Sequence, residues 1–151
     1  MTCGQDRAVM LWNPMRQEEA EEADSALRES ARVLRRPIKA YTGHSHEVYG
    51  VAIAPDNGSF VSCGADRMVI VWDVTTGRAK RKIPGHTHRV NAVALNADAS
   101  VALSAGYDKA VRCWDLRSHS REPIQTLAHA RDSVSSVYVR GHLIVSGSVD
   151  D

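Results

Sequence analysis

A short residue pattern occurs twice in this 151-residue chain, and every element of the second copy lies 42 residues after its counterpart in the first. The elements are Gly-His, then Ser-x-x-x-Asp, then Trp-Asp. They are Gly43-His44, Ser62, Asp66 and Trp72-Asp73 in one copy, and Gly85-His86, Ser104, Asp108 and Trp114-Asp115 in the other. A period near 40 residues is typical of repeat proteins, whose units bury their apolar faces against neighbouring units. The sequence therefore predicts a row of similar units.

Each unit contains short apolar runs separated by turn residues. The runs cover residues 48–53, 59–62, 69–72 and 79–83 in one unit, and 90–95, 101–104, 110–114 and 124–127 in the next. Many of these residues are β-branched and the runs are bounded by Gly, Asn and Asp, which favours strands joined by tight turns. Four short antiparallel strands per period is the arrangement of a β-propeller blade, so we predict an all-β fold.

These elements at this spacing resemble the WD40 repeat family. Residues 43–73 and 85–115 match as two complete repeats. Residues 1–13 resemble the end of an earlier repeat, 14–40 an insert-bearing loop with an outer strand, and 129–151 a truncated repeat that has Ala130 where the others have histidine. The resemblance implies a partial WD40 β-propeller of about three to four blades, from a ring of seven that needs about 300 residues. We therefore expect a truncated chain, which needs the missing blades or another chain to close the ring.

Within the family, the chain resembles the mitogen-activated protein kinase organizer and WD repeat 83 group. The matching stretches are residues 11–14, 41–44, 71–74, 111–115 and 125–150. The resemblance implies a non-enzymatic scaffold whose partners are other proteins, in ERK-type kinase cascades or in spliceosomal complexes. It also implies a cytoplasmic or nuclear location, or both.

Ser, His and Asp recur together, which raises the alternative of a hydrolase. A catalytic triad needs one exposed nucleophile beside oxyanion donors, whereas these residues recur once per structural unit. We therefore favour a structural role. The family resemblance implies two buried hydrogen-bonded tetrads, and it implies partial tetrads at both ends of the chain. The complete tetrads are His44, Ser62, Asp66, Trp72 and His86, Ser104, Asp108, Trp114, and the partial ones contain Thr2, Asp6, Trp12 and Ser146, Asp150.

Composition argues against several other classes of function. The net charge of +1 does not provide the basic surface that direct nucleic-acid binding requires. The three cysteines form no CxxC pair and no histidines have zinc-ligand spacing, so we expect no metal, no cofactor and a reducing compartment. The sequence contains no run of 18 apolar residues, so it predicts no membrane-spanning helix.

Two segments suggest more specific interactions. Asp115 and Arg117 belong to a Trp-Asp-x-Arg sequence, which resembles the box by which some propellers bind the adaptor of a cullin-RING ubiquitin ligase. A role as a substrate receptor is therefore an alternative to the scaffold, although so short a motif also occurs by chance. Residues 16–36 have a run of acidic residues in their first half and basic ones at their end, as a helix would favour. A solvated helix or loop is the simpler interpretation, and a docking helix is the alternative.

Overall fold

The computed structural model describes residues 1–12 and 37–149, and all regular structure in them is β-strand. The insert at 16–36 therefore lies outside the described residues. The strands are β1 (Thr2–Cys3), β2 (Ala8–Leu11), β3 (Lys39–Thr42), β4 (Val48–Ile53), β5 (Ser59–Gly64), β6 (Met68–Asp73), β7 (Ala79–Pro84), β8 (Val90–Leu95), β9 (Val101–Gly106), β10 (Val111–Asp115), β11 (Gln125–Leu127), β12 (Val134–Arg140) and β13 (Leu143–Ser148).

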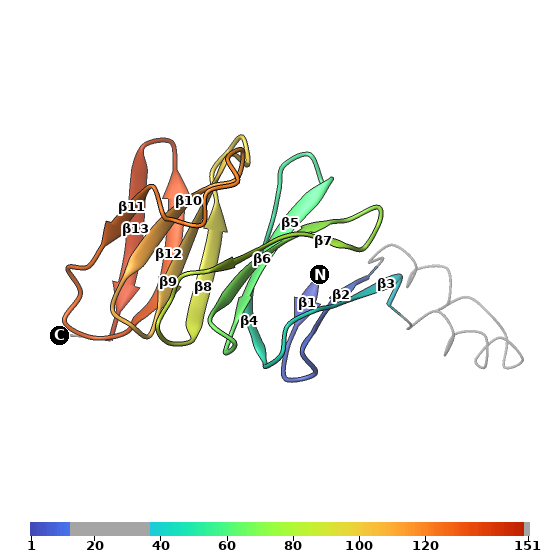
Figure 1. Ribbon diagram of the computed structural model, residues 1–151, viewed down its shortest axis with the longest axis horizontal. Coiled ribbons are helices and arrows are strands. Elements are labelled where there is room, and N and C mark those ends of the chain that lie inside the picture. Colours follow the sequence, from blue (N-terminus) through green and yellow to red (C-terminus); the bar gives the residue numbers. More distant parts are fainter. Residues whose placement is uncertain (13–36, 150–151) are drawn as a thin grey trace, which may run out of the picture.

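The strands form four antiparallel sheets in which sequence neighbours pair (Figure 1). Two sheets have four strands, in the orders β4-β5-β6-β7 and β8-β9-β10-β11, and we call them the second and third blades. The strands β1-β2-β3 form the first blade, and β12-β13 form the fourth. The predicted all-β, partial-propeller fold is confirmed. Strand β3 continues to Thr42, two residues past the expected boundary at residue 40.

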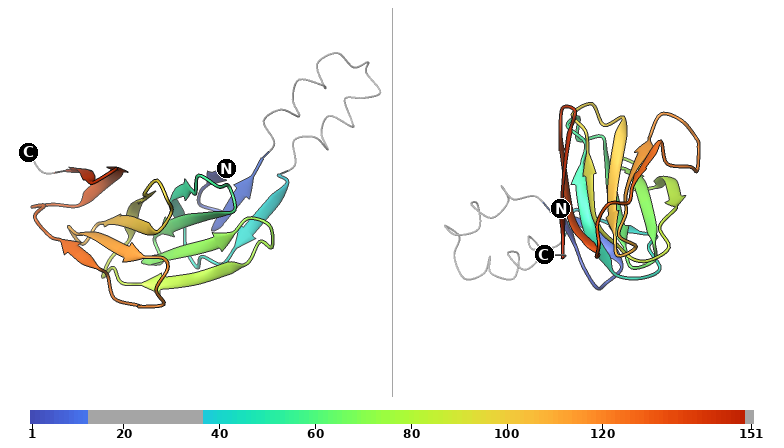
Figure 2. Two further views of the ribbon diagram at one scale, coloured as in Figure 1. Left: turned by 90° about the horizontal axis from the view of Figure 1, so that it is seen from above. Right: turned by 90° about the vertical axis from the view of Figure 1, so that its left-hand side faces the viewer.

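The four sheets stand side by side along an open arc (Figure 2). The first strand of each complete blade packs beside its counterpart in the next blade. Strand β4 contacts β8, and β8 contacts β12. The last strands, β3, β7 and β11, lie on the outer side of the arc. As a result, the turns of the blades lie along two opposite edges of the molecule.

The apolar core lies between blades. One buried cluster joins the first and second blades, another joins the second and third, and another joins the third and fourth. The second and third blades therefore bury both faces against neighbours, as the repeat period predicted. The largest side chains are Tyr41, Phe60 and Trp72 between the first and second blades, and Ile83 and Trp114 between the second and third. Between the third and fourth blades they are Leu103 and Val134.

A tight turn follows the same aspartate in three blades. The residue after that aspartate is Arg7, Arg67 or Lys109, with a φ of 61°, 65° or 64°. This left-handed conformation is uncommon for a residue other than glycine. In the first two of these blades, an aspartate oxygen supports the turn by accepting a backbone N–H two residues later, at 3.3 Å from Asp6 to Ala8 and at 3.2 Å from Asp66 to Met68. The turns thus place one basic residue of each of these three blades at the same edge.

Candidate functional site

The second blade brings its four predicted tetrad residues into one hydrogen-bonded chain. The indole Nε1 of Trp72 donates to the Ser62 hydroxyl oxygen at 2.8 Å. Ser62 Oγ lies 2.7 Å from Nε2 of His44, and Nδ1 of His44 lies 2.8 Å from the Asp66 carboxylate. The chain runs from β6 through β5 to the loop before β4, and so ties two strands to the edge of the blade.

The direction of the chain follows from its two fixed ends. The Trp72 indole only donates and the Asp66 carboxylate only accepts. Ser62 therefore donates its proton to Nε2 of His44, and the Nδ1–H of His44 donates to Asp66. Hydrogen bonds from His44 and from the amides of Ser45 and Met68 outweigh the effect of burial, and they lower the pKa of Asp66.

The third blade repeats the chain at the same distances. Trp114 Nε1 lies 2.8 Å from Ser104 Oγ, which lies 2.7 Å from His86 Nε2, and His86 Nδ1 lies 2.8 Å from Asp108. One residue has been added here. The guanidinium of Arg112, on β10, donates to the other Asp108 oxygen at 2.6 Å. The same Arg112 nitrogen lies 2.7 Å from His86 Nδ1, so a positive charge adjoins the imidazole.

The added cation lowers the pKa values of both titratable groups in the third-blade tetrad. Burial is the largest influence on His86 and lowers its pKa, and the Arg112 charge lowers it further, against the opposing effect of Asp108. Burial alone would raise the pKa of Asp108, but hydrogen bonds from His86 and Arg112 lower it to about 2. At neutral pH the third blade therefore holds a neutral imidazole between a carboxylate and a guanidinium.

The glycine of each Gly-His pair is explained by the tryptophan of the same blade. A Cβ built on Gly43 would lie 2.8 Å from the Trp72 ring, and one on Gly85 would meet the Trp114 ring more closely still. Real Cβ atoms essentially never lie within 3.0 Å of such a neighbour. Close approach of the indole, and not backbone conformation, therefore requires glycine before each histidine.

The geometry decides what these Ser-His-Asp sets do chemically. Ser62 and Ser104 both have a relative exposure of 0%. Each hydroxyl also accepts from an indole while it donates to a histidine. A nucleophile has to reach a substrate, and these two oxygens are enclosed by the blade. The observed arrangement accordingly fastens strands together in both complete blades.

The partial tetrads are less enclosed. Trp12 Nε1 donates to the Thr2 hydroxyl at 2.8 Å, and Trp12 is 37% exposed. The Asp6 carboxylate accepts from the Ala8 amide at 3.3 Å. In the fourth blade, Ser146 is exposed on β13, and Asp150 lies outside the described residues. The first blade thus keeps the indole–hydroxyl pair at the chain position where the resemblance placed it.

Comparison with known proteins agrees with this geometry. The family model described as "WD domain, G-beta repeat" matches residues 35–73 and 77–115. These two segments make up more than half of the chain and contain both complete tetrads. The chain belongs to the WD40 repeat family. WD40 domains provide platforms for protein interactions, so protein partners are implied for this chain.

Individual relatives extend the match beyond the two complete WD40 repeats. The chain is 46% identical over 150 residues to WD repeat domain-containing protein 83 of Rattus norvegicus. It is also 46% identical over 150 residues to an uncharacterized WD repeat-containing protein of Schizosaccharomyces pombe. A ribosome biogenesis protein, the WDR12 homolog of Chlamydomonas reinhardtii, is 33% identical over 48% of this chain. The chain spans 42% and 44% of the length of the first two relatives, and 14% of the third.

The structure also locates the predicted Trp-Asp-x-Arg box on this WD40 arc. Asp115 ends β10, and its carboxylate accepts the backbone N–H of Arg117 at 2.8 Å. This hydrogen bond is the main cause that lowers the pKa of Asp115. The Arg117 side chain is 73% exposed and lies 3.0 Å from Asp98. The box is therefore accessible, with its arginine in a surface ion pair.

The sequence analysis missed a second set of repeated residues, which join neighbouring WD40 blades. Arg81, on β7, donates to the backbone oxygens of Asp115, Ser118 and Ser120 in the next blade. Lys39, on β3, lies 42 residues earlier and donates to the backbone oxygen of Thr75 at 2.5 Å. The same 42-residue offset that revealed the tetrads applies to Lys39 and Arg81, and it was the signal available.

Within residues 1–12 and 37–149, no three His, Cys, Asp or Glu side chains are grouped so as to hold a metal ion. Over the same residues, no helix has the length and apolar character to cross a membrane. Cys63 and Cys113 are buried free thiols, Cys3 is half-buried, and burial is the largest cause that raises the pKa of each.

Proposed function

We propose that this protein is a non-catalytic WD40 scaffold that assembles other proteins on its exposed loops. The observation that carries the proposal is the complete burial of Ser62 and Ser104 within repeated hydrogen-bonded chains. Such residues give the blades rigidity, whereas the turns at the two edges are free to vary and to bind. Function then comes from the geometry with which the rigid arc presents its loops.

The proposed setting is assembly of a mitogen-activated protein kinase cascade, spliceosomal pre-mRNA processing, or both, in the cytoplasm or the nucleus. The support is the 46% identity to WD repeat domain-containing protein 83, which runs over 99% of the chain and includes the divergent fourth blade. Generic WD40 constraints are weakest in that blade, because it lacks the tetrad histidine. The likeness there favours this group over other WD40 proteins.

Crosslinking followed by affinity purification of the tagged protein from cells tests this setting. We expect recovery of kinase-cascade or spliceosomal components at a constant ratio to the bait. Recovery of neither class, with the protein folded and expressed, would contradict the proposed setting. A matched control is Trp72→Ala, which should loosen the packing between the first and second blades and reduce the recovery of specific partners.

The hydrolase alternative makes an opposite prediction for one variant. If Ser104 were a nucleophile, Ser104→Ala would abolish turnover and leave the fold intact. We expect instead that Ser104→Ala lowers the thermal midpoint, since the substitution leaves the indole N–H of Trp114 without its acceptor. Thermal melting together with ester-hydrolysis assays separates the two outcomes.

A second candidate function is that of a substrate receptor for a cullin-RING ubiquitin ligase. The exposed Arg117 side chain, next to Asp115, is the observation that supports it. The test is recovery of the ligase adaptor with wild type, with Arg117→Ala, and with Asp98→Asn, which leaves the arginine in place without its ion pair. Loss only with Arg117→Ala would support this candidate. Equal recovery from all three proteins, or none, would reject it.

A further inference from the structure

The repeat separates residues that hold the fold from residues that do not. Positions needed by the blade recur after 42 residues, as the tetrads do. Two exposed positions beside the third-blade tetrad break this rule. Arg89 stands where the second blade has Glu47, and Tyr107 stands where it has Ala65. Because the second blade folds with Glu and Ala at these places, the fold does not require the arginine or the tyrosine.

Arg89 and Tyr107 nevertheless form an ordered contact. The Arg89 guanidinium lies over the Tyr107 ring, 4.7 Å from its centroid. The edge of the His88 ring meets the same tyrosine, with centroids 6.0 Å apart at 84°. The Tyr107 amide donates to the Arg89 carbonyl at 2.9 Å, which fixes the two residues relative to each other. The tyrosine remains 46% exposed.

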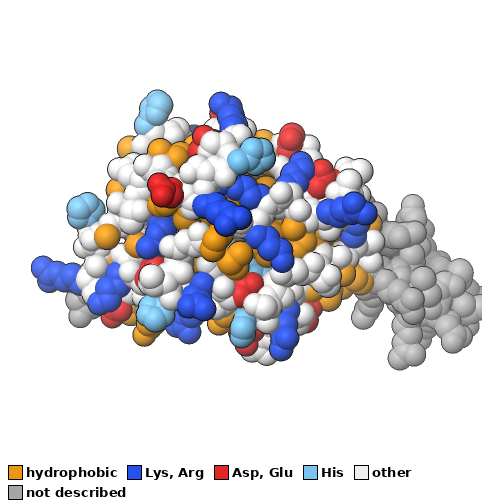
Figure 3. Space-filling view, in the orientation of Figure 1, with side chains coloured by type: hydrophobic (Ala, Val, Ile, Leu, Met, Phe, Trp, Pro, Cys, Tyr) orange, Lys and Arg blue, Asp and Glu red, His pale blue; other side chains and the backbone are white. Residues whose placement is uncertain are grey.

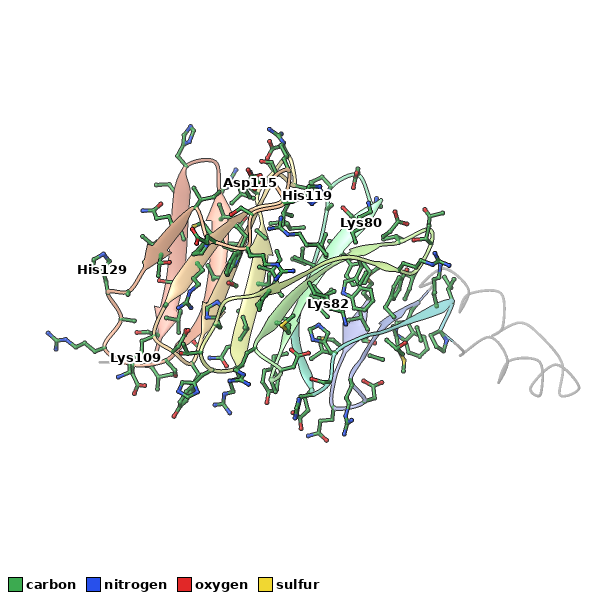
Figure 4. All side chains as sticks on the ribbon, viewed as in Figure 1. Lys80, Lys82, Lys109, Asp115, His119 and His129 are labelled. Carbon is green, nitrogen blue, oxygen red and sulfur yellow. The ribbon has the colours of Figure 1, made fainter. Side chains whose placement is uncertain are left out.

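The charge of this group is available to a partner. Among the described residues, no carboxylate lies within 4.0 Å of the Arg89 guanidinium. The nearby Asp108 side chain is only 5% exposed and is held by His86 and Arg112. Lys109 follows it and donates to the backbone oxygen of Arg131 at the same edge (Figure 4). Figure 3 shows Lys, Arg and His side chains along this lower edge of the molecule.

We propose that His88, Arg89, Tyr107 and Lys109, here called the Arg89 cluster, form a docking site for an acidic segment of a partner protein. The proposal rests on the proposed scaffold function and specifies the chemistry of one partner. The tyrosine ring holds the guanidinium in place, so that less side-chain freedom is lost when its N–H groups bind a carboxylate. Lys109 supplies a second positive charge for a neighbouring acidic residue.

An acidic peptide fits the Arg89 cluster better than a nucleic acid does. Affinity for nucleic acid depends on many phosphate contacts, and the whole chain has a net charge of +1. Glu47 and Asp132, among the loops of the same edge, confine the positive charge to the Arg89 cluster, which is too small for many phosphate contacts. One tyrosine that is already in contact with Arg89 and His88 does not offer the row of open aromatic faces that single strands use.

The test measures binding of a fluorescent oligoglutamate peptide to the full-length protein by anisotropy. Oligoglutamine of the same length and a single-stranded DNA oligonucleotide serve as comparison probes. The key variant combines Arg89→Glu with Tyr107→Ala, which installs the residues of the second blade. We expect wild type to prefer oligoglutamate and the double variant to bind it at least about tenfold more weakly. An unchanged thermal midpoint will show that the variant is folded.

Arg121→Glu is the matched control, since it reverses an exposed arginine in the loop between β10 and β11, at the opposite edge. It should leave oligoglutamate binding unchanged. The inference is overturned if both variants weaken binding equally, if wild type does not bind oligoglutamate, or if DNA binds as tightly. If the double variant still co-purifies with its cellular partners while wild type fails this peptide test, the docking inference fails and the scaffold proposal stands.

Discussion

The second and third blades contain the same hydrogen-bonded chain in different surroundings. In the second blade, the tryptophan is part of an aromatic group. Trp72 is stacked on Phe60, with centroids 5.9 Å apart at 11°, and meets Tyr41 edge-on at 6.0 Å. Each aromatic pair of this kind adds about 0.5–1.5 kcal/mol beyond the area that it buries.

In the third blade, the corresponding neighbours are aliphatic. Ile83 stands at the place of Tyr41 and Ala102 at the place of Phe60, and both pack with Trp114 in one buried cluster. The third blade differs also at the carboxylate end of the chain. Arg112 replaces the buried Ile70 of the second blade and holds Asp108. Trp72 is thus packed against aromatic rings, whereas Trp114 belongs to a hydrogen-bonded chain that ends in an ion pair.

This difference teaches which parts of a repeat are interchangeable. The four tetrad residues recur because each donor and acceptor has to meet one partner at hydrogen-bond distance. Their surroundings vary because many combinations of side chains fill a given volume between two blades. Stability can therefore be distributed differently in blades that have the same hydrogen bonds.

The largest expected effect concerns the two tryptophans. Trp72→Ala and Trp114→Ala should each lower the free energy of unfolding by about 3–5 kcal/mol. We expect the loss to be greater for Trp72, by about 1 kcal/mol, because two aromatic pairs disappear with it. Urea denaturation followed by circular dichroism measures both values.

Phe60→Leu is the control for this aromatic contribution. It retains most of the apolar volume but removes the stacked ring. In that background, the effect of Trp72→Ala should fall toward that of Trp114→Ala, which a double-mutant cycle reports. A larger loss for Trp114→Ala in the wild-type background would show that the aromatic surroundings do not strengthen the second blade.

The next effect concerns the two aspartates. Asp108→Ala should cost about 3 kcal/mol or more, because it leaves the largely buried guanidinium of Arg112 beside His86 without its carboxylate. Asp66→Ala should cost about 1–3 kcal/mol, since the His44 ring and two backbone amides lose their acceptor and no guanidinium is left without a partner. The double variant Asp108→Ala/Arg112→Ile should regain stability over Asp108→Ala alone. No gain in thermal denaturation would contradict the role given to Arg112.

These comparisons also show how far sequence reasoning extended. The spacing of Ser104, Asp108 and Trp114 predicted strands and turns, and the family resemblance implied which residues lie within hydrogen-bond distance, because the repeat fixes all of them together. It did not predict Arg112 or the Arg89–Tyr107 contact, since neither has a counterpart in the second blade. Contacts between blades depend on side-chain lengths and on the curvature of the arc. Arg81 could still have been found, because Lys39 precedes it by one period.

A third effect should be equal in the two blades. Ser62→Ala and Ser104→Ala each remove the oxygen that joins an indole to an imidazole, and each should cost about 1–3 kcal/mol. Because the hydrogen-bond distances are the same in both blades, we expect the two values to agree within about 0.5 kcal/mol. Denaturation of the two variants under one condition is the measurement. Threonine at each position keeps the hydroxyl and should restore part of the loss.

The smallest effect is a pH dependence that belongs to the third blade. The pKa of His86 lies below its usual value of 6.5 in the folded protein, because of burial first and the Arg112 charge next. The unfolded chain therefore binds this proton more readily. The resulting stability is present above about pH 6.5 and is lost as pH falls through the folded pKa. The lowered pKa of Asp108 stabilises the protein over a lower pH range. This stability is present above about pH 3.8 and is lost as the pH falls toward about 2.

Arg112→Ile gives the third blade the residue of the second, and so separates the effect of the Arg112 charge on the pKa of His86 from the effect of burial. Removing the cation should raise the pKa of His86 toward its usual value. The drop in stability between pH 7 and pH 5 should therefore be smaller than in wild type, by about 1 kcal/mol or less. It should also raise the pKa of Asp108, which loses a hydrogen-bond donor. NMR titration of the His86 ring measures the first change directly. Arg121→Ile removes an exposed arginine and should leave His86 unchanged. A His86 pKa that stays constant in Arg112→Ile would mean that burial alone keeps the imidazole neutral.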